Sequence, residues 1–304
     1  MGEILALLCA FLWAISVLIL RTQTHHLKPL TLNLIRIVIC ASLICPLLFL
    51  FPIQTYRSLP WQAYGMICGS LVIGLMFGDT CYIKSIALLG AARAMPITNA
   101  FPVFALLVSP WLTGEQITLH MAIGTSCVVA GVTMIVRSGS LAATAALERE
   151  LGSRAAVVGV LFGLIAALSW TVSTSIHRIV FVQYNPDALM VATVRMSFIG
   201  VISALLLWFR PRDPGQDKLT GKNWLAIVAS ALCGPFLGGI LFVGATKYTG
   251  VARVASLVTT APIYGVPLAV LYLGERINRL TVLGATLTLL GAWTVSAPPE
   301  WQLF

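Results

Sequence analysis

Uncharged, strongly apolar stretches of membrane-spanning length recur along the whole chain. The hydrocarbon core of a bilayer is roughly 30 Å thick, so a helix needs about 20 apolar residues to cross it. Such stretches predict ten transmembrane helices, near residues 3–20, 31–52, 62–84, 92–111, 117–136, 155–177, 187–209, 223–244, 251–273 and 279–296. Only 10% of the 304 residues are charged, against about 25% in soluble domains. We therefore predict an all-α, multi-pass integral membrane protein with no separate soluble domain.

The second half of the sequence repeats the first, with many matched positions 160 residues apart. The pairs at this offset include Gly90 with Gly250, Arg93 with Arg253, Pro102 with Pro262, Glu115 with Glu275, Gly124 with Gly284 and Gly131 with Gly291. The matches divide the chain into two five-helix repeats, residues 1–137 and 155–304, with a linker at 138–154. Because five is odd, the second repeat enters the bilayer from the opposite side. Inverted-topology repeats of this kind are typical of secondary transporters, which bind substrate near the midplane between the repeats.

Each half carries the same landmarks in the same order. A tryptophan lies on the first helix, an arginine in the second, a proline in the fourth and a Gly-Glu pair after it; the residues are Trp13, Arg36, Pro102 and Gly114-Glu115, then Trp170, Arg195, Pro262 and Gly274-Glu275. With these landmarks the sequence resembles the EamA-type members of the drug/metabolite transporter superfamily, with one EamA domain in each half. The resemblance implies export of small metabolites, often driven by protons, and leaves the substrate open.

The basic residues are unevenly shared between the two ends of the predicted helices. The loops on the side of both termini carry only Arg57, Arg178, Lys247 and Arg253, whereas thirteen of the 19 lysines and arginines lie on the other side. Cytoplasmic loops of membrane proteins carry the excess of positive charge. The charge count therefore predicts both termini outside a cell (plasma or inner) membrane, whereas the family resemblance implies the reverse.

Few charged residues fall inside the predicted spans, and a charge there is costly enough to need a reason. Asp79 is the only acid well inside a span, and its repeat partner is Gly239. It is either a proton-coupling or substrate-amine group, or a carboxylate that Lys84, Arg36 or Tyr82 holds for packing. Lys84 lies near a helix end and can instead extend to the membrane surface. Arg36 and Arg195 either bind backbone carbonyls or form a pair that faces an anionic substrate.

Several uncharged side chains are candidates to line a cavity. Trp13 and Trp170 lie near midspan, each three residues before a serine on the same helical face. Polar groups precede the two prolines Pro102 and Pro262, which remove a helical hydrogen bond and kink the helix. Those candidates are Asn99, Thr259 and Thr260, together with Tyr264. They either contact substrate or repair the kink.

Two other features concern the helices themselves. His177 falls at the end of a predicted helix. Pairs of glycines four residues apart, such as Gly65/Gly69 and Gly74/Gly78, predict close helix contacts within the bundle.

These observations favour a secondary transporter of small polar metabolites, of the amino-acid or organic-anion type. It would export them by alternating access around a midplane cavity, with possible proton coupling at Asp79. A multidrug or lipid-carrier translocator of the same superfamily is the alternative. An intramembrane enzyme has little support, since no metal-, nucleophile- or phosphate-binding motif occurs. We expect a small-molecule substrate and the lipid bilayer as partners, with no cofactor, metal or nucleic acid, and a monomer fits.

Overall fold

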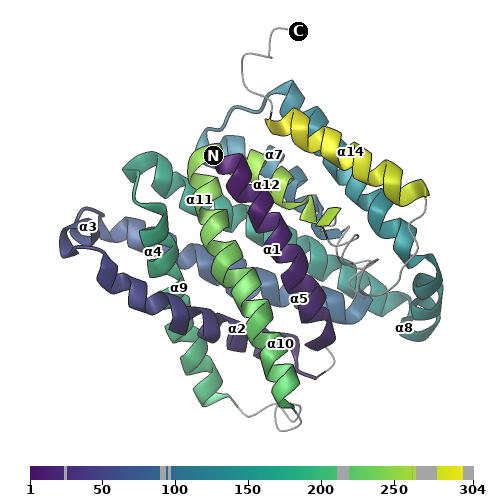
Figure 1. Cartoon of the computed structure of the whole chain (residues 1–304), viewed down its shortest axis with the longest axis horizontal. Coiled ribbons are helices and arrows are strands. Elements are labelled where there is room, and N and C mark those ends of the chain that lie inside the picture. Colours follow the sequence, from purple (N-terminus) through teal and green to yellow (C-terminus); the bar gives the residue numbers. More distant parts are fainter. Residues whose placement is uncertain are drawn as a thin grey trace.

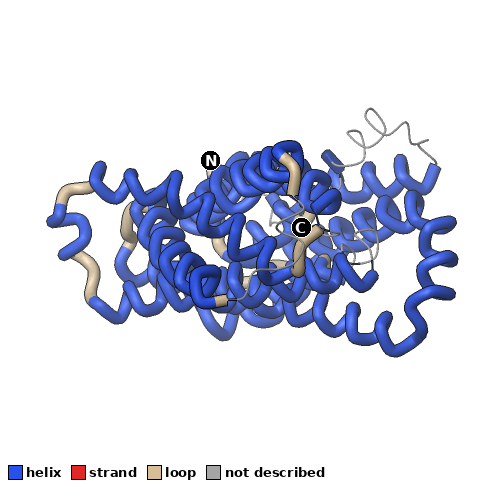
Figure 2. Tube along the Cα trace, turned by 90° about the horizontal axis from the view of Figure 1, so that it is seen from below, coloured by secondary structure: helices blue, strands red, loops and turns tan. Residues whose placement is uncertain are grey.

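The protein was studied as a computed structural model that describes residues 1–23, 26–89, 94, 97–210, 219–261, 263–264 and 279–296. The described residues form helices and connecting turns, and no strand occurs among them. Figure 2 shows the helices running alongside one another, with loops mainly where the chain reverses. The all-α class that the sequence predicts is confirmed for this part of the chain.

The first half begins with α1 (Gly2–Gln23) and α2 (Pro29–Ile44), which continues into the tighter helix η1 (Cys45–Leu50). After the short α3 (Ile53–Arg57), the chain forms α4 (Trp61–Leu71), η2 (Val72–Gly78) and α5 (Asp79–Leu89) without a break. The helix α7 (Ala100–Thr113) follows and ends at Gly114, whose positive φ of 67° suits a glycine.

The remaining helices hold the end of the first half, in the first part of α8, and the whole of the second half. These are α8 (Leu119–Tyr184), α9 (Ala188–Phe209), α10 (Gly221–Ala231), η4 (Leu232–Gly238), α11 (Gly239–Thr249), α12 (Val251–Val258) and α14 (Arg279–Ser296). Figure 1 shows α1 running beside α10 and α11, and α14 lying along α8 on one flank. The first helix of the chain thus packs directly on the second half.

Within the described residues, six helical stretches are long and apolar enough to cross a membrane. They are Gly2–Leu20, Pro29–Leu50, Trp61–Leu89, Ala155–Tyr184, Ala188–Phe209 and Gly221–Thr249. Shorter apolar helices at Ala100–Thr113, Leu119–Met134 and Val282–Ser296 match three further predicted spans. The span predicted at 251–273 lies partly outside the described residues, so the count of ten stays a prediction.

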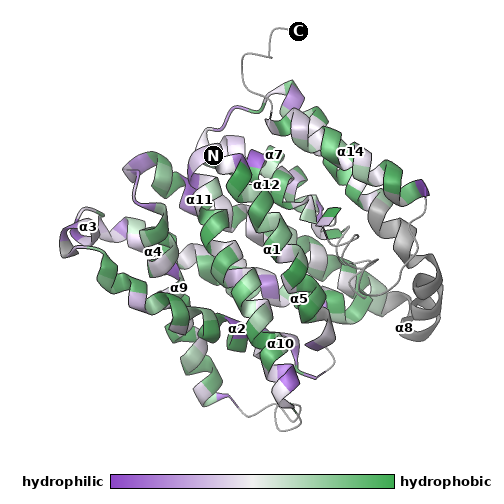
Figure 3. Ribbon diagram, viewed as in Figure 1, coloured by the Kyte–Doolittle hydropathy of each residue, from purple (hydrophilic) through white to green (hydrophobic). Residues whose placement is uncertain are grey.

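Hydrophobic residues cover the lengths of these helices, and hydrophilic ones gather at their ends, as at the start of α10 (Figure 3). Large apolar side chains are exposed on the outer faces, among them Trp208 and Phe209 near the end of α9. Exposed apolar side chains in such number suit a lipid environment rather than water.

The segment predicted as the linker, 138–154, is helical, because α8 runs without interruption through its 66 residues. Its role as the join between two repeats stays a prediction. The segment contains Ala142, Ala143, Ala145, Ala146 and Leu147, residue types with high helix propensity. Its charged residues lower its hydropathy, so it was not predicted to span the membrane, but charged residues are compatible with a helix.

The fifth predicted helix of each repeat packs on the other through glycine. A Cβ atom added to Gly124, in the first part of α8, would lie 2.8 Å from the backbone oxygen of Gly291 in α14. Gly131 faces Gly284 in the same way. In the repeat, Gly124 corresponds to Gly284 and Gly131 to Gly291. In space the pairing is crossed, because Gly124 contacts Gly291 and Gly131 contacts Gly284. Only glycine allows two helix backbones to approach this closely.

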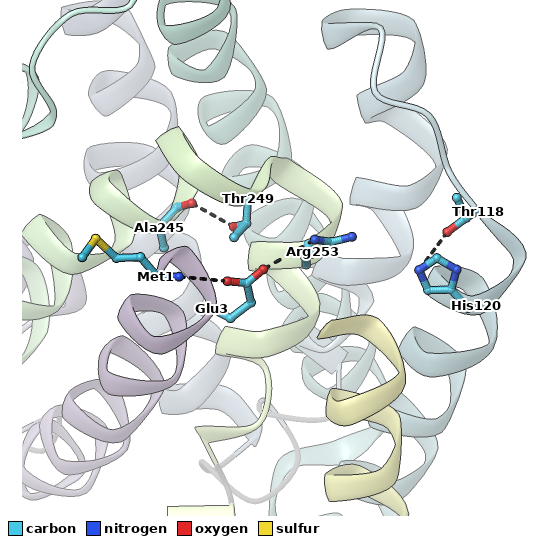
Figure 4. A network of polar contacts seen from close by, with 7 residues as sticks. All are labelled: Met1, Glu3, Thr118, His120, Ala245, Thr249 and Arg253. Carbon is cyan, nitrogen blue, oxygen red and sulfur yellow. Dashed lines mark hydrogen bonds and ion pairs between the residues drawn. The ribbon is translucent and has the colours of Figure 1, made fainter. Parts of the chain in front are cut away.

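At the end of the bundle where the chain begins, polar contacts join the two halves. The Glu115 carboxylate accepts hydrogen bonds from the backbone N–H groups of Val251 (3.1 Å) and Ala252 (3.3 Å), at the start of α12. Glu3 in α1 forms an ion pair with Arg253 in α12, at 3.5 Å (Figure 4). A carboxylate at a helix N-terminus satisfies free N–H groups and opposes the positive end of the helix dipole. Glu115 is therefore a helix cap that spans the two halves.

Candidate functional site

The first helix of the chain docks into the η4 turn of the second half. Ser16 in α1 donates a hydrogen bond to the backbone oxygen of Ser230, at 2.7 Å. Gly234 leaves room for Ser16, and Gly238 leaves room for the indole of Trp13. The segment η4 is a π-helix, whose wider turn frees backbone carbonyls that a helix normally pairs.

The same arrangement occurs between α8 and η2, with the halves exchanged: here the second half supplies the serine-bearing helix and the first half supplies the π-helix η2. Ser173 donates to the backbone oxygen of Ser70 at 2.5 Å. Gly74 leaves room for Ser173, and Gly78 leaves room for Trp170. The two docking contacts therefore place both tryptophan–serine pairs at the boundary between the halves.

Asp79 makes the two contacts chemically different. The indole Nε1–H of Trp170 donates to Asp79 Oδ1 at 2.8 Å. Tyr82 packs edge-on against the same indole, with 5.3 Å between ring centroids. On the other side, Phe242 packs against Trp13 at 5.2 Å, and Gly239 stands where Asp79 would be. The acidic group is thus present in only one of two otherwise similar contacts.

Arg36 connects the acidic side to the opposite half. It is buried in α2, and its Nη2 donates to Ser16 Oγ at 3.2 Å and to the Ser230 oxygen at 3.5 Å. Its positive charge also acts on Asp79, without a direct ion pair between the two side chains. Arg36 therefore has two oxygen acceptors and a carboxylate nearby, whereas its Nε, like that of Arg195, has no hydrogen-bond partner.

Arg195, at the matching position in α9, has a different environment. Its Nη1 lies 3.4 Å from Nδ1 of His177, and its Nε has no hydrogen-bond partner. His177 is fully buried, seven residues before the end of α8. The sequence placed His177 at a helix end because the helix was expected to stop near residue 177, and the structure overturns that placement.

Two sequence candidates lie away from this cluster. Lys84 is exposed on α5, with its Nζ 4.7 Å from the centre of the Phe162 ring. Tyr264 packs edge-on against Phe11 of α1, at 5.6 Å between ring centroids. Neither has a polar contact with Asp79 among the described residues.

The two helices that carry prolines are both interrupted at the matched positions 99 and 259. Asn99 forms the turn before α7, so Pro102 lies in the first turn of that helix, where proline is tolerated. Thr259 and Thr260 follow the end of α12. Their hydroxyls donate to the backbone oxygens of Ala255 (2.8 Å) and Leu257 (2.7 Å).

These threonine hydroxyls are therefore occupied by local backbone bonds, whereas Nδ2 of the buried Asn99 has no partner. Pro262 lies outside the described residues. Asn99 is accordingly the candidate of this group with a free polar atom.

Sequence reasoning missed Asn33, Ser70 and Ser230. Asn33 Nδ2 donates to the Leu75 oxygen at 2.8 Å and to Thr80 Oγ1 at 3.1 Å, so it satisfies a carbonyl of the π-helix. Ser70 and Ser230, like Gly74 and Gly234, stand 160 residues apart, so the repeat offset alone could have paired them.

The fold and the site define a polytopic helical membrane protein whose polar groups are concentrated between two similar halves. The sequence profile of the EamA-like transporter family matches residues 1–137 and 157–297. The chain belongs to that family, and it is therefore an integral membrane transporter.

Similar proteins agree with this membership. An "Uncharacterized transporter" of Archaeoglobus fulgidus is 24% identical over 97% of this chain and 98% of its own length. A "Probable amino-acid metabolite efflux pump" of Salmonella typhimurium is 23% identical over 95% of this chain and 92% of its own length. One crystal structure of a protein superposes with a TM-score of 0.73 at 20% identity and covers 97% of each chain. That likeness establishes the fold alone.

Proposed function

We propose that the protein is a secondary transporter that exports small polar metabolites, of the amino-acid or organic-anion type, across the cell membrane. The names of the Salmonella typhimurium and Escherichia coli relatives, both probable amino-acid metabolite efflux pumps, support the substrate class and the direction. A small-molecule substrate and the lipid bilayer are its partners, and a monomer is sufficient for the mechanism.

The mechanism is alternating access, with the two inverted repeats rocking about their shared boundary. Each tryptophan-bearing helix docks on the third predicted helix of the opposite half through one serine hydroxyl bond and small glycine contacts. Such contacts bury little side-chain surface and can be separated and remade. The substrate binds where they part, between Trp13 on one side and Trp170 on the other.

The observation that carries this proposal is the single carboxylate in an otherwise repeated site. Asp79 is held by Trp170 and balanced by Arg36, and the other half has glycine in its place. A lone acid in the membrane interior can take up and release a proton as the halves alternate, or it can bind a substrate amine. In either role, a change in the charge of Asp79 alters the contact between α8 and η2, because Trp170 of α8 donates a hydrogen bond to Asp79.

The test is transport of labelled amino acids by purified protein in liposomes, with and without an imposed pH gradient. We expect Asp79→Asn to reduce gradient-driven transport at least tenfold. Gly239→Asn is the matched control, because it places the same side chain at the repeat-equivalent position, where a Cβ meets open space. Unchanged pH-driven transport by Asp79→Asn would remove the coupling role.

The same assay separates the alternative function. A multidrug translocator would carry hydrophobic cations, which bind acidic and aromatic groups. Transport of such cations, with no transport of amino acids or organic anions, would replace the present proposal.

A further inference from the structure

Arg195 is a buried cation whose charge is not balanced by any described residue. Only 5% of its surface is exposed. No ion pair joins Arg195 to a carboxylate in the described part of the chain. Burying an uncompensated charge costs several kcal/mol, so a retained arginine of this kind needs a function.

Among the described residues, His177 contacts the guanidinium of Arg195 and offers it no acceptor. His177 Nδ1 lies 2.9 Å from the backbone oxygen of Ser173, and this distance places the proton on Nδ1, donating to that oxygen. The Nδ1–H of His177 and the Nη1–H of Arg195 are then two donors, 3.4 Å apart. The guanidinium therefore faces a donor and keeps its own hydrogen-bonding capacity for another group.

The position of Arg195 relative to Asp79 follows from α8. Trp170, Ser173 and His177 are spaced three and four residues apart, so they share one face of that helix. Trp170 contacts Asp79 and His177 contacts Arg195. At 1.5 Å per residue, the two contacts are about 10 Å apart along α8. One helical face thus carries an acidic end, close enough to Arg36 for its charge to act on it, and a basic end that lacks a counter-ion among the described residues.

We propose that Arg195 is the anion-binding group of the transport site and that it binds a carboxylate or phosphate of the substrate through its guanidinium. The proposal rests on the proposed function and narrows the substrate class to anionic or zwitterionic metabolites. It also separates the two matched arginines, since Arg36 is the internal partner of Asp79 and Arg195 is the partner of the ligand.

The test measures thermal stability of the purified protein in a neutral detergent, as sodium formate or sodium phosphate replaces sodium chloride at constant ionic strength. A ligand that binds only the folded protein raises its stability by mass action. We expect the wild-type melting temperature to rise along a saturable curve. Arg195→Gln should raise the apparent dissociation constant at least tenfold, and Arg195→Lys, which keeps the charge without the planar fork, should raise it less.

A second readout distinguishes ligand binding from a structural role. Without added formate or phosphate, Arg195→Gln should melt at or above the wild-type temperature, because it removes an unbalanced buried charge. The matched variant Arg36→Gln should melt lower, because it breaks contacts with Ser16 and Ser230 and leaves Asp79 unbalanced.

Three results overturn the proposal. They are the absence of an anion-dependent shift in the wild-type protein, an equal shift in Arg195→Gln, or a loss of stability in Arg195→Gln that matches Arg36→Gln. If Arg195→Gln does not fold, the dissociation constant of Arg195→Lys decides. The melting-temperature assay measures anion binding and does not depend on transport. A negative result in the transport assay would therefore count against the proposed function and not against anion binding at Arg195.

Discussion

The contact between Gly74 and Ser173 joins the two halves, and Gly74→Ala is expected to weaken it. An ideal Cβ at Gly74 would lie 2.7 Å from Ser173 Cβ, whereas ordinary contact begins at 3.4 Å. It would also press on Ser173 Oγ, which donates to the Ser70 oxygen. Both atoms belong to the short side chain of Ser173, whose Cβ is fixed to the α8 backbone, so the strain is relieved by moving α8 away from η2.

The expected cost follows from three terms. Overpacking of a tight contact costs about 1–3 kcal/mol, and loss of the Ser173 hydrogen bond costs about 0.5–1.5 kcal/mol. Alanine regains about 1 kcal/mol over glycine in a helix. The sum is a net destabilisation of about 0.5–3.5 kcal/mol.

The assay is a comparison of melting temperature and of transport rate between Gly74→Ala and Gly69→Ala. Gly69 is the control because it lies one turn and a residue earlier and its Cβ would meet nothing within 4 Å. The sequence predicted a close helix contact at Gly65 and Gly69, and the described residues give none there. Equal stability of the two variants would refute the claim that Gly74 forms the junction.

Two further predictions concern single polar contacts. Glu115→Ala should destabilise the protein by about 1 kcal/mol, since it removes the acceptor for the N–H groups of Val251 and Ala252; Glu3→Ala, which loses only a partly exposed ion pair, should cost less than about 1 kcal/mol. Melting curves of both variants check this, and equal losses would contradict it. Trp170→Phe should slow amino-acid transport about tenfold, because a hydrogen bond to a charged group is worth about 1.5–3 kcal/mol. Trp13→Phe is its control, since its repeat-equivalent position lacks a carboxylate, and equal rates in the two variants would show that the Asp79 bond is dispensable.

Hydropathy was sufficient to locate individual helices. The span predicted at 187–209 matches α9 (Ala188–Phe209), and the one at 3–20 lies within α1 (Gly2–Gln23). Hydropathy did not predict the helix that α8 forms at 138–154, because hydropathy reports preference for the membrane and not helix propensity. A charged, alanine-rich segment can be helical without being apolar.

The site was only partly predictable. The isolation of Asp79 and its mismatch with Gly239 were visible in the sequence, and Arg36 was among its expected partners. Its hydrogen-bond donor, Trp170, lies 91 residues away and was not among them. Periodicity along one helix cannot reveal which distant helix packs against it. The π-helices η2 and η4 were equally hidden, since no single residue type specifies an extra residue in a helical turn.

The central claim is that this chain moves small polar metabolites across a bilayer, and counterflow tests it most directly. Liposomes with and without the purified protein would be loaded with unlabelled amino acids and diluted into a trace of the labelled ones. The present account predicts transient accumulation of label above the outside concentration only in liposomes that contain the protein. Equal label in empty and protein-containing liposomes, for amino acids and for organic anions alike, would contradict it.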